Sequence, residues 1–152
     1  MFPRIALFLL INFGGLAIGG LFTPSGVESD WYEGLNKAPW TPPGWVFGAA
    51  WTTIMICFSI YLAFLWAKLE DKKPLIWTFV LAFVLNVGWN PVFFYFQQVG
   101  LGLVIITLLT IVIGYFLFHY WSTLQQKSLL IAPYLIWLLI ATSLNAYVLL
   151  KN

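Results

Sequence analysis

The sequence predicts an all-α integral membrane protein, with five transmembrane helices forming a single domain over residues 1–152. Hydrophobic residues make up 62% of the chain and charged residues only 8%, whereas a soluble domain carries about 25% charged residues. The twelve charges are also clustered, which leaves four long charge-free stretches. Because lipid offers no partner for unpaired backbone groups, runs this long and apolar favour helices over barrel strands.

The charge-free stretches give the number and position of the predicted helices. A bilayer core about 30 Å thick needs roughly 20 helical residues. Three stretches each hold one span, and the stretch from Pro74 to Gln126 holds two, separated by the polar, glycine-rich break at 97–102. The predicted helices cover residues 4–22, 44–67, 75–96, 101–122 and 128–150.

The first helix resembles a signal peptide only superficially. Its apolar run is about 20 residues long and no small-x-small cleavage site precedes polar sequence, which favours a retained helix. Gly15 and Gly19 form a small-xxx-small face that allows close helix packing. That face fits either packing within the chain or a dimer contact, and the sequence does not decide between them.

The distribution of Lys and Arg predicts the orientation of the bundle. One side carries five basic residues and the other carries two. This excess predicts an N-terminus inside and the 23–43 loop outside. The five are Arg4, Lys68, Lys72, Lys73 and Lys127, and the two are Lys37 and Lys151.

The loop from Thr23 to Pro43 is the one long connection. Ser29 or Asp30 can cap a short helix that begins with Trp31 and Tyr32. Prolines then stiffen the segment, and long ordered loops in compact domains are often lids. The alternative is an interfacial aromatic belt, in which Trp and Tyr anchor at headgroup level. The residues alone leave both interpretations open.

Asn86 and Asn90 are the costliest polar residues within the third span. They lie four residues apart, so they share a helix face that must point into the bundle. Their amides can join helices to each other or hydrogen-bond a polar group of a ligand. Pro91 follows directly and predicts a bend, because proline removes a backbone donor.

Several classes of chemistry lack the residues they need. A net charge of +2 is too small for a nucleic-acid binder. No cluster of His, Cys, Asp and Glu points to a dedicated metal site. The single histidine, His119, fits an interfacial position better than a haem ligand or a proton relay. Every acidic residue lies outside the spans, so no Ser-His-Asp set can form.

Three motifs in order resemble the TspO/translocator protein family of tryptophan-rich sensory proteins and peripheral-type benzodiazepine receptors. The segment Trp31–Pro43, W-Y-E-G-L-N-K-A-P-W-T-P-P, followed by Trp51, is similar to the family's loop and second helix. The segments Leu85–Phe94 and Ala132–Tyr147 are similar to its third and fifth helices. Ala38 and Asn90 depart from the usual pattern.

The resemblance implies a homodimer with a ligand pocket closed by the loop. The implied ligands are porphyrins such as protoporphyrin IX and haem, sterols in some members, and benzodiazepine-type compounds, with no obligatory cofactor. Together with Asn90, which the argument on buried amides adds, the expected ligand-binding residues are Trp31, Tyr32, Pro42, Trp51, Asn86, Trp89, Asn90, Trp137 and Ala141. Leu144, Tyr147 and Lys151 fit the family's sterol pattern.

Three functions remain open at the level of sequence. The first is a receptor or sensor for porphyrins in a membrane, expected to be the bacterial cell membrane. The second is light-dependent degradation of protoporphyrin IX, for which the resemblance implies Trp51 and Trp137 as reacting residues. The third is transport of tetrapyrroles or sterols, which ranks lowest because an odd number of spans forbids a simple two-half repeat.

Overall fold

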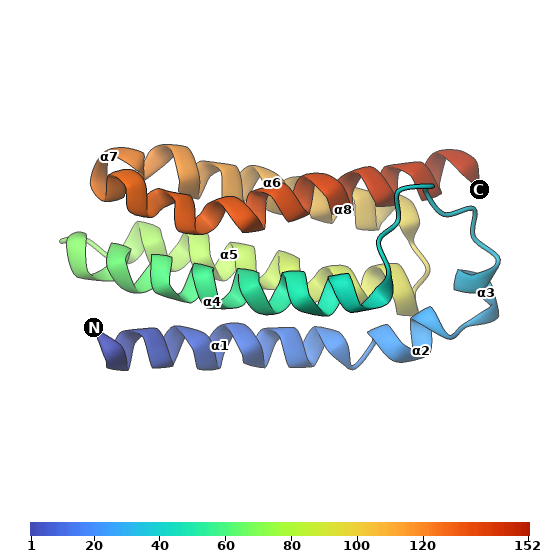
Figure 1. The fold of residues 1–152 in the computed structure, drawn as a ribbon, viewed down its shortest axis with the longest axis horizontal. Helices are drawn as coiled ribbons and strands as arrows, with labels where there is room; N and C mark the ends of the chain where they lie inside the picture. The colour runs from blue at the N-terminus through green and yellow to red at the C-terminus, as the bar shows by residue number, and fades with distance from the viewer.

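The computed structural model describes all 152 residues and shows a bundle of five long helices (Figure 1). Each of them is long and apolar enough to cross a membrane, so the protein is a multi-pass membrane protein. The prediction of an all-α bundle is confirmed. The long helices are α1 (Phe2–Gly20), α4 (Gly44–Lys68), α5 (Lys73–Asn90), α6 (Val99–His119) and α8 (Ala132–Lys151).

The five helices form a closed ring in which each packs on two neighbours. Helix α1 contacts α4 and α5, α6 contacts α5 and α8, and α4 contacts α8 to complete the ring. One continuous hydrophobic cluster fills the centre, with Tyr61, Phe116 and Tyr134 among its most buried members. The N-terminus lies at one end, and the C-terminus lies at the other end beside the loop that precedes α4 (Figure 1).

The shorter elements correct several predicted boundaries. The 23–43 segment contains the predicted short helix, α3 (Asp30–Glu33), and one helical turn that was not predicted, α2 (Thr23–Val27). The last long helix begins at Ala132 rather than 128, after α7 (Trp121–Leu124) and the 3-10 helix η2 (Gln125–Ile131). The later start was not predicted because Leu129, Leu130 and Ile131 are as apolar as the helix that they precede.

The predicted cap at Ser29 is present, and at Pro91, where a bend is predicted, the chain forms a π-helical turn. The Ser29 hydroxyl accepts a hydrogen bond from the Tyr32 backbone N–H at 3.2 Å, which fixes the start of α3. From Pro91 to Tyr95 the chain forms a π-helical turn, η1, closed by the Phe96 N–H on the Pro91 carbonyl. Proline lacks the backbone N–H that a regular α-helix uses as a donor. The backbone hydrogen bonds here therefore change from a spacing of four residues to a spacing of five.

Packing between α1 and α5 accounts for the glycines of the first helix. A Cβ atom on Gly15 would lie 2.5 Å from the ring of Phe83, and one on Gly19 would lie 2.8 Å from the Asn90 amide nitrogen. Both glycines are buried. The small-xxx-small face therefore serves packing within the chain, which answers the question that the sequence left open.

Candidate functional site

The 23–43 loop is docked onto the π-helical turn η1 through aromatic contacts. The Trp31 and Phe93 rings meet edge to face at 5.7 Å, and the Tyr32 and Phe94 rings lie 5.6 Å apart. Burial raises the pKa of the Tyr32 phenol above its usual value of 10.0. The Lys37 ammonium lies 4.5 Å from the centroid of the Tyr32 ring. The loop thus holds a defined position over the end of α5.

The second half of the loop is fastened to the C-terminal end of α8. The Trp40 indole N–H donates to the Ser143 hydroxyl at 3.1 Å, and its ring packs against Tyr147 at 5.3 Å. The Asn36 backbone N–H donates to the side-chain oxygen of Asn152 at 2.9 Å. These attachments carry the loop across one end of the bundle (Figure 1), the arrangement that a lid requires.

Trp89 takes part in a polar connection between three spans. Its indole N–H donates to the Asn145 side-chain oxygen at 3.1 Å, and the Asn145 amide donates to the Val99 carbonyl at 2.9 Å. This links α5, α8 and α6 directly beneath the loop, because Trp89 also stacks on Phe93 at 4.8 Å. The sequence analysis assigned no role to Asn145.

The two asparagines of α5 have different surroundings. Asn86 is half-buried and follows Ala82 on the face that also presents Trp89 to the interior, and it makes no side-chain hydrogen bond within the protein. Asn90 is half-buried next to Gly19 of α1, and its side-chain oxygen accepts from the Thr23 hydroxyl at 3.0 Å. Asn86 therefore has both its side-chain oxygen and its side-chain nitrogen free to meet a polar group of a ligand, whereas Asn90 has only its nitrogen free.

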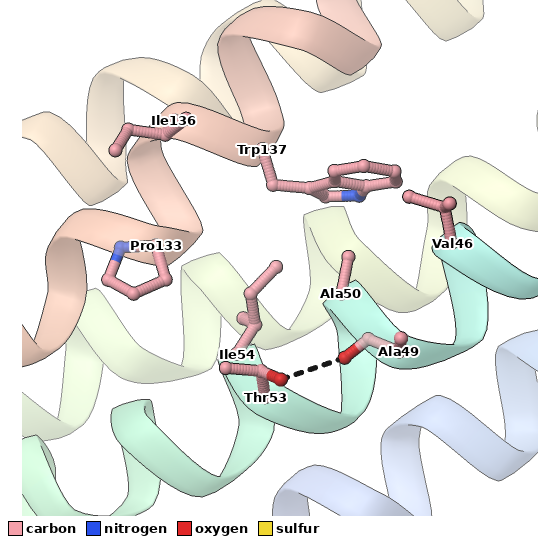
Figure 2. Close-up of a pocket in the computed structure, with 8 residues that line it drawn as sticks. All are labelled: Val46, Ala49, Ala50, Thr53, Ile54, Pro133, Ile136 and Trp137. Carbon is pink, nitrogen blue, oxygen red and sulfur yellow. Dashed lines mark hydrogen bonds between the residues drawn. The ribbon is translucent and has the colours of Figure 1, made fainter. Parts of the chain in front are cut away.

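A cleft of about 390 Å³ lies between α4 and α8. Figure 2 shows Trp137 and Pro133 of α8 facing Val46, Ala50 and Ile54 of α4. The cleft is apolar and opens at the partly exposed edge of the seam. Its lining residues are Val46, Ala49, Ala50, Thr53, Ile54, Pro133, Ile136 and Trp137.

Trp51 and Trp137 occupy neighbouring positions along the same aromatic seam. Trp137 packs edge to face on Phe47 at 5.2 Å, and Trp51 packs edge to face on Tyr134 at 5.8 Å. Trp137 lines the cleft and Trp51 does not. Ala141 lies one turn beyond Trp137, half-buried against the core, and Pro42 is half-buried at the loop's entry into α4.

The sequence contains a pattern that predicts the cleft, although the family motifs do not include it. Ala49, Ala50 and Thr53 are small residues near the start of α4, and they leave space opposite Pro133 and Trp137. The sterol-pattern residues lie at the C-terminal end of α8, where Tyr147 is covered by Trp40. Leu144 is half-buried there, and Lys151 is exposed.

The fold and the site together define a five-span membrane protein with an aromatic, loop-covered bundle end. Residues 7–150 match the TspO/MBR family, and the chain belongs to that family. It is 36% identical over 141 residues to the tryptophan-rich protein TspO of Archaeoglobus fulgidus, covering 88% of this chain and 87% of that protein. It is 35% identical to TspO of Chlorobaculum tepidum, covering 97% and 92%. It is also 32% identical to the human translocator protein, covering 86% and 79%.

Gly26 offers a way to loosen the loop without touching its aromatic residues. It is buried in α2, and a Cβ atom there would collide with Phe94, 2.6 Å from its Cγ. We expect Gly26→Ala to push α2 off η1 at a cost of about 1–3 kcal/mol. Cleavage by trypsin after Lys37, the only basic residue of the loop, should therefore rise at least about fivefold.

The matched control is Gly14→Ala, because Gly14 is in α1 and a Cβ atom there would meet nothing within 4 Å. Its cleavage should equal that of the unchanged protein. Equal cleavage of Gly26→Ala and Gly14→Ala would contradict the docked position of the loop.

Proposed function

We propose that this protein is a membrane receptor that binds porphyrins, with the face of the macrocycle against Trp137. The observation that carries the proposal is the apolar α4–α8 cleft beside the Trp137 indole. Its volume of about 390 Å³ lies within the range of about 300–1,000 Å³ typical of small-molecule sites. Flat aromatic ligands suit such a wall, because indoles offer rigid stacking faces.

The polar edge of a porphyrin needs partners as well. The free Asn86 amide can donate to a carboxylate, and Lys37 on the loop supplies a positive charge at the covered end of the bundle. Asn86 and Lys37 can reach a porphyrin in the cleft only if the cleft opens into the bundle interior. That opening requires the side chains between α4 and α8 to shift. The cleft already separates α4 from α8 along part of that seam, which makes it the natural place for the bundle to widen.

The setting of the protein is part of the proposal. We place it in a bacterial cell membrane, with the N-terminus inside and the 23–43 loop outside. We also propose a homodimer, as the family resemblance implies. Because Gly15 and Gly19 are occupied within the chain, the dimer contact must use another surface. Sterol binding at Leu144, Tyr147 and Lys151 requires Trp40 to leave Tyr147.

Binding of protoporphyrin IX to purified protein tests this function. We expect saturable quenching of intrinsic Trp fluorescence, because Trp137 lines the cleft and Trp51 lies on the same seam. The loop should also become more resistant to trypsin at Lys37 when porphyrin is bound. Quenching no greater than that of another Trp-rich membrane protein would overturn the proposal.

Ala141→Thr locates the ligand within the bundle. The added hydroxyl and methyl groups fill space one turn beyond Trp137, and overpacking costs about 1–3 kcal/mol. We expect the dissociation constant for protoporphyrin IX to rise at least about fivefold while the protein stays folded. Ala17→Thr, at an exposed alanine of α1, adds the same atoms and should leave binding unchanged. Equal affinities of Ala141→Thr and Ala17→Thr for protoporphyrin IX would show that the ligand does not bind next to Ala141.

A further inference from the structure

A second cavity, of about 230 Å³, lies at the end of the bundle opposite the 23–43 loop. Its walls come from the last turns of α4, the end of α7 and the start of η2. The lining residues are Phe64, Lys68, Thr123, Leu124, Gln125 and Lys127. Four of these six are polar and none is acidic. We propose that this cavity binds the phosphate-bearing headgroup of an anionic phospholipid such as phosphatidylglycerol.

The charge of the cavity is the first argument. Lys68 is the last residue of α4, and the Lys127 ammonium lies 4.3 Å from the centroid of the Phe64 ring on the cavity wall. No carboxylate in the lining neutralises either lysine. Two ammonium groups, with the Thr123 hydroxyl and the Gln125 amide, offer the charged and neutral donors that a phosphodiester accepts.

The position of the cavity at the ends of the helices favours a lipid headgroup as its ligand. Lys68 ends α4, and α7 and η2 connect α6 to α8 at the same end of the bundle, so the cavity lies where a bilayer's headgroups lie. Phe118 and Trp121 are exposed nearby, at 74% and 44%, and provide an apolar surface for acyl chains. Basic pockets between transmembrane helices on the Lys-rich side are typical sites for anionic headgroups.

The backbone of the connection is shaped around the cavity. Gln125 has φ 51° and ψ −127°, a conformation that residues other than glycine rarely adopt and that clusters at functional sites. This turn redirects the chain from α7 into η2 and brings Gln125 and Lys127 to the same cavity. A regular helix through this segment would place them on different faces.

Native mass spectrometry of the protein in mixed micelles of phosphatidylglycerol and phosphatidylcholine tests the proposal. We expect the unchanged protein to retain phosphatidylglycerol selectively. K68Q/K127Q should weaken that retention about 25-fold, at about fivefold for each lysine near the headgroups. K37Q/K151Q removes two positive charges from the opposite end and should retain the lipid as the unchanged protein does. Lys127→Arg keeps the charge and should also retain it.

Three results would overturn the proposal. One is equal retention of the two lipids by the unchanged protein. Another is an equal loss in K68Q/K127Q and K37Q/K151Q, which would indicate attraction by net charge alone. The third is displacement of phosphatidylglycerol by millimolar inorganic phosphate, which would make the cavity a site for free phosphate. Thermal unfolding followed by Trp fluorescence checks that each variant is folded; should K68Q/K127Q unfold, Lys127→Gln alone decides, with an expected loss of about fivefold.

Discussion

Asn145→Ala is expected to lower the stability of the bundle by about 1–3 kcal/mol, because it leaves the Trp89 indole N–H without an acceptor and removes a side-chain donor from the Val99 carbonyl. The Trp89 indole N–H loses its acceptor at 3.1 Å, and the Val99 carbonyl loses a donor at 2.9 Å. Asn145 is only 3% exposed, so water cannot readily replace it. The three groups belong to α8, α5 and α6, and the substitution therefore weakens two helix interfaces at once.

Thermal unfolding in detergent, followed by Trp fluorescence, measures the effect. A loss of this size should lower the Tm by about 2–4 °C for each kcal/mol in a chain of this length. Thr107→Ala is the control, because the Thr107 hydroxyl bonds only to the Leu103 carbonyl of its own helix and should change the Tm little. A double-mutant cycle with Trp89→Phe should show a coupling of about 0.6–1.7 kcal/mol. Strictly additive losses would contradict the connection.

The Asn145 connection also shows why the sequence predicts the fold better than the site. Five spans follow from where charges are absent, which is a property of each segment alone. The partners of Asn145 lie 46 and 56 residues away, and no local pattern pairs them. The position of Asn90 shows the same limit, since its hydrogen bond to Thr23 depends on the packing of α1 against α5.

The local structure of the 23–43 loop was predictable from the sequence, but its attachment to the bundle was not. Its cap at Ser29 is a local interaction between residues three apart, so the sequence contains it. Its attachment to η1 depends on the π-helical turn, which carries Phe93 and Phe94 toward Trp31 and Tyr32. The sequence predicted a bend at Pro91, whereas the π-helical turn that forms there depends on the packing of the whole bundle end.

Replacing both Trp51 and Trp137 with phenylalanine separates binding from photochemistry, and this is the largest functional effect that we expect. Phenylalanine keeps an aromatic face but is much harder to oxidise than an indole. Each change should weaken protoporphyrin IX binding by about 0.5–1.5 kcal/mol, the size of one aromatic contact. If the family-implied degradation takes place here, light-driven formation of a porphyrin product should nearly cease at saturating porphyrin.

The single variants show which indole the chemistry uses. Trp137 lines the α4–α8 cleft, whereas Trp51 packs on Tyr134 and reaches a ligand only if the seam widens. We therefore expect Trp137→Phe to lose more product than Trp51→Phe, with absorption spectra of illuminated samples as the measurement. Trp77→Phe, at a 72% exposed tryptophan of α5, controls for general photobleaching and should form product normally. A full yield from the saturated double variant would refute the degradation activity and leave a binding protein, since the macrocycle would then react without either indole.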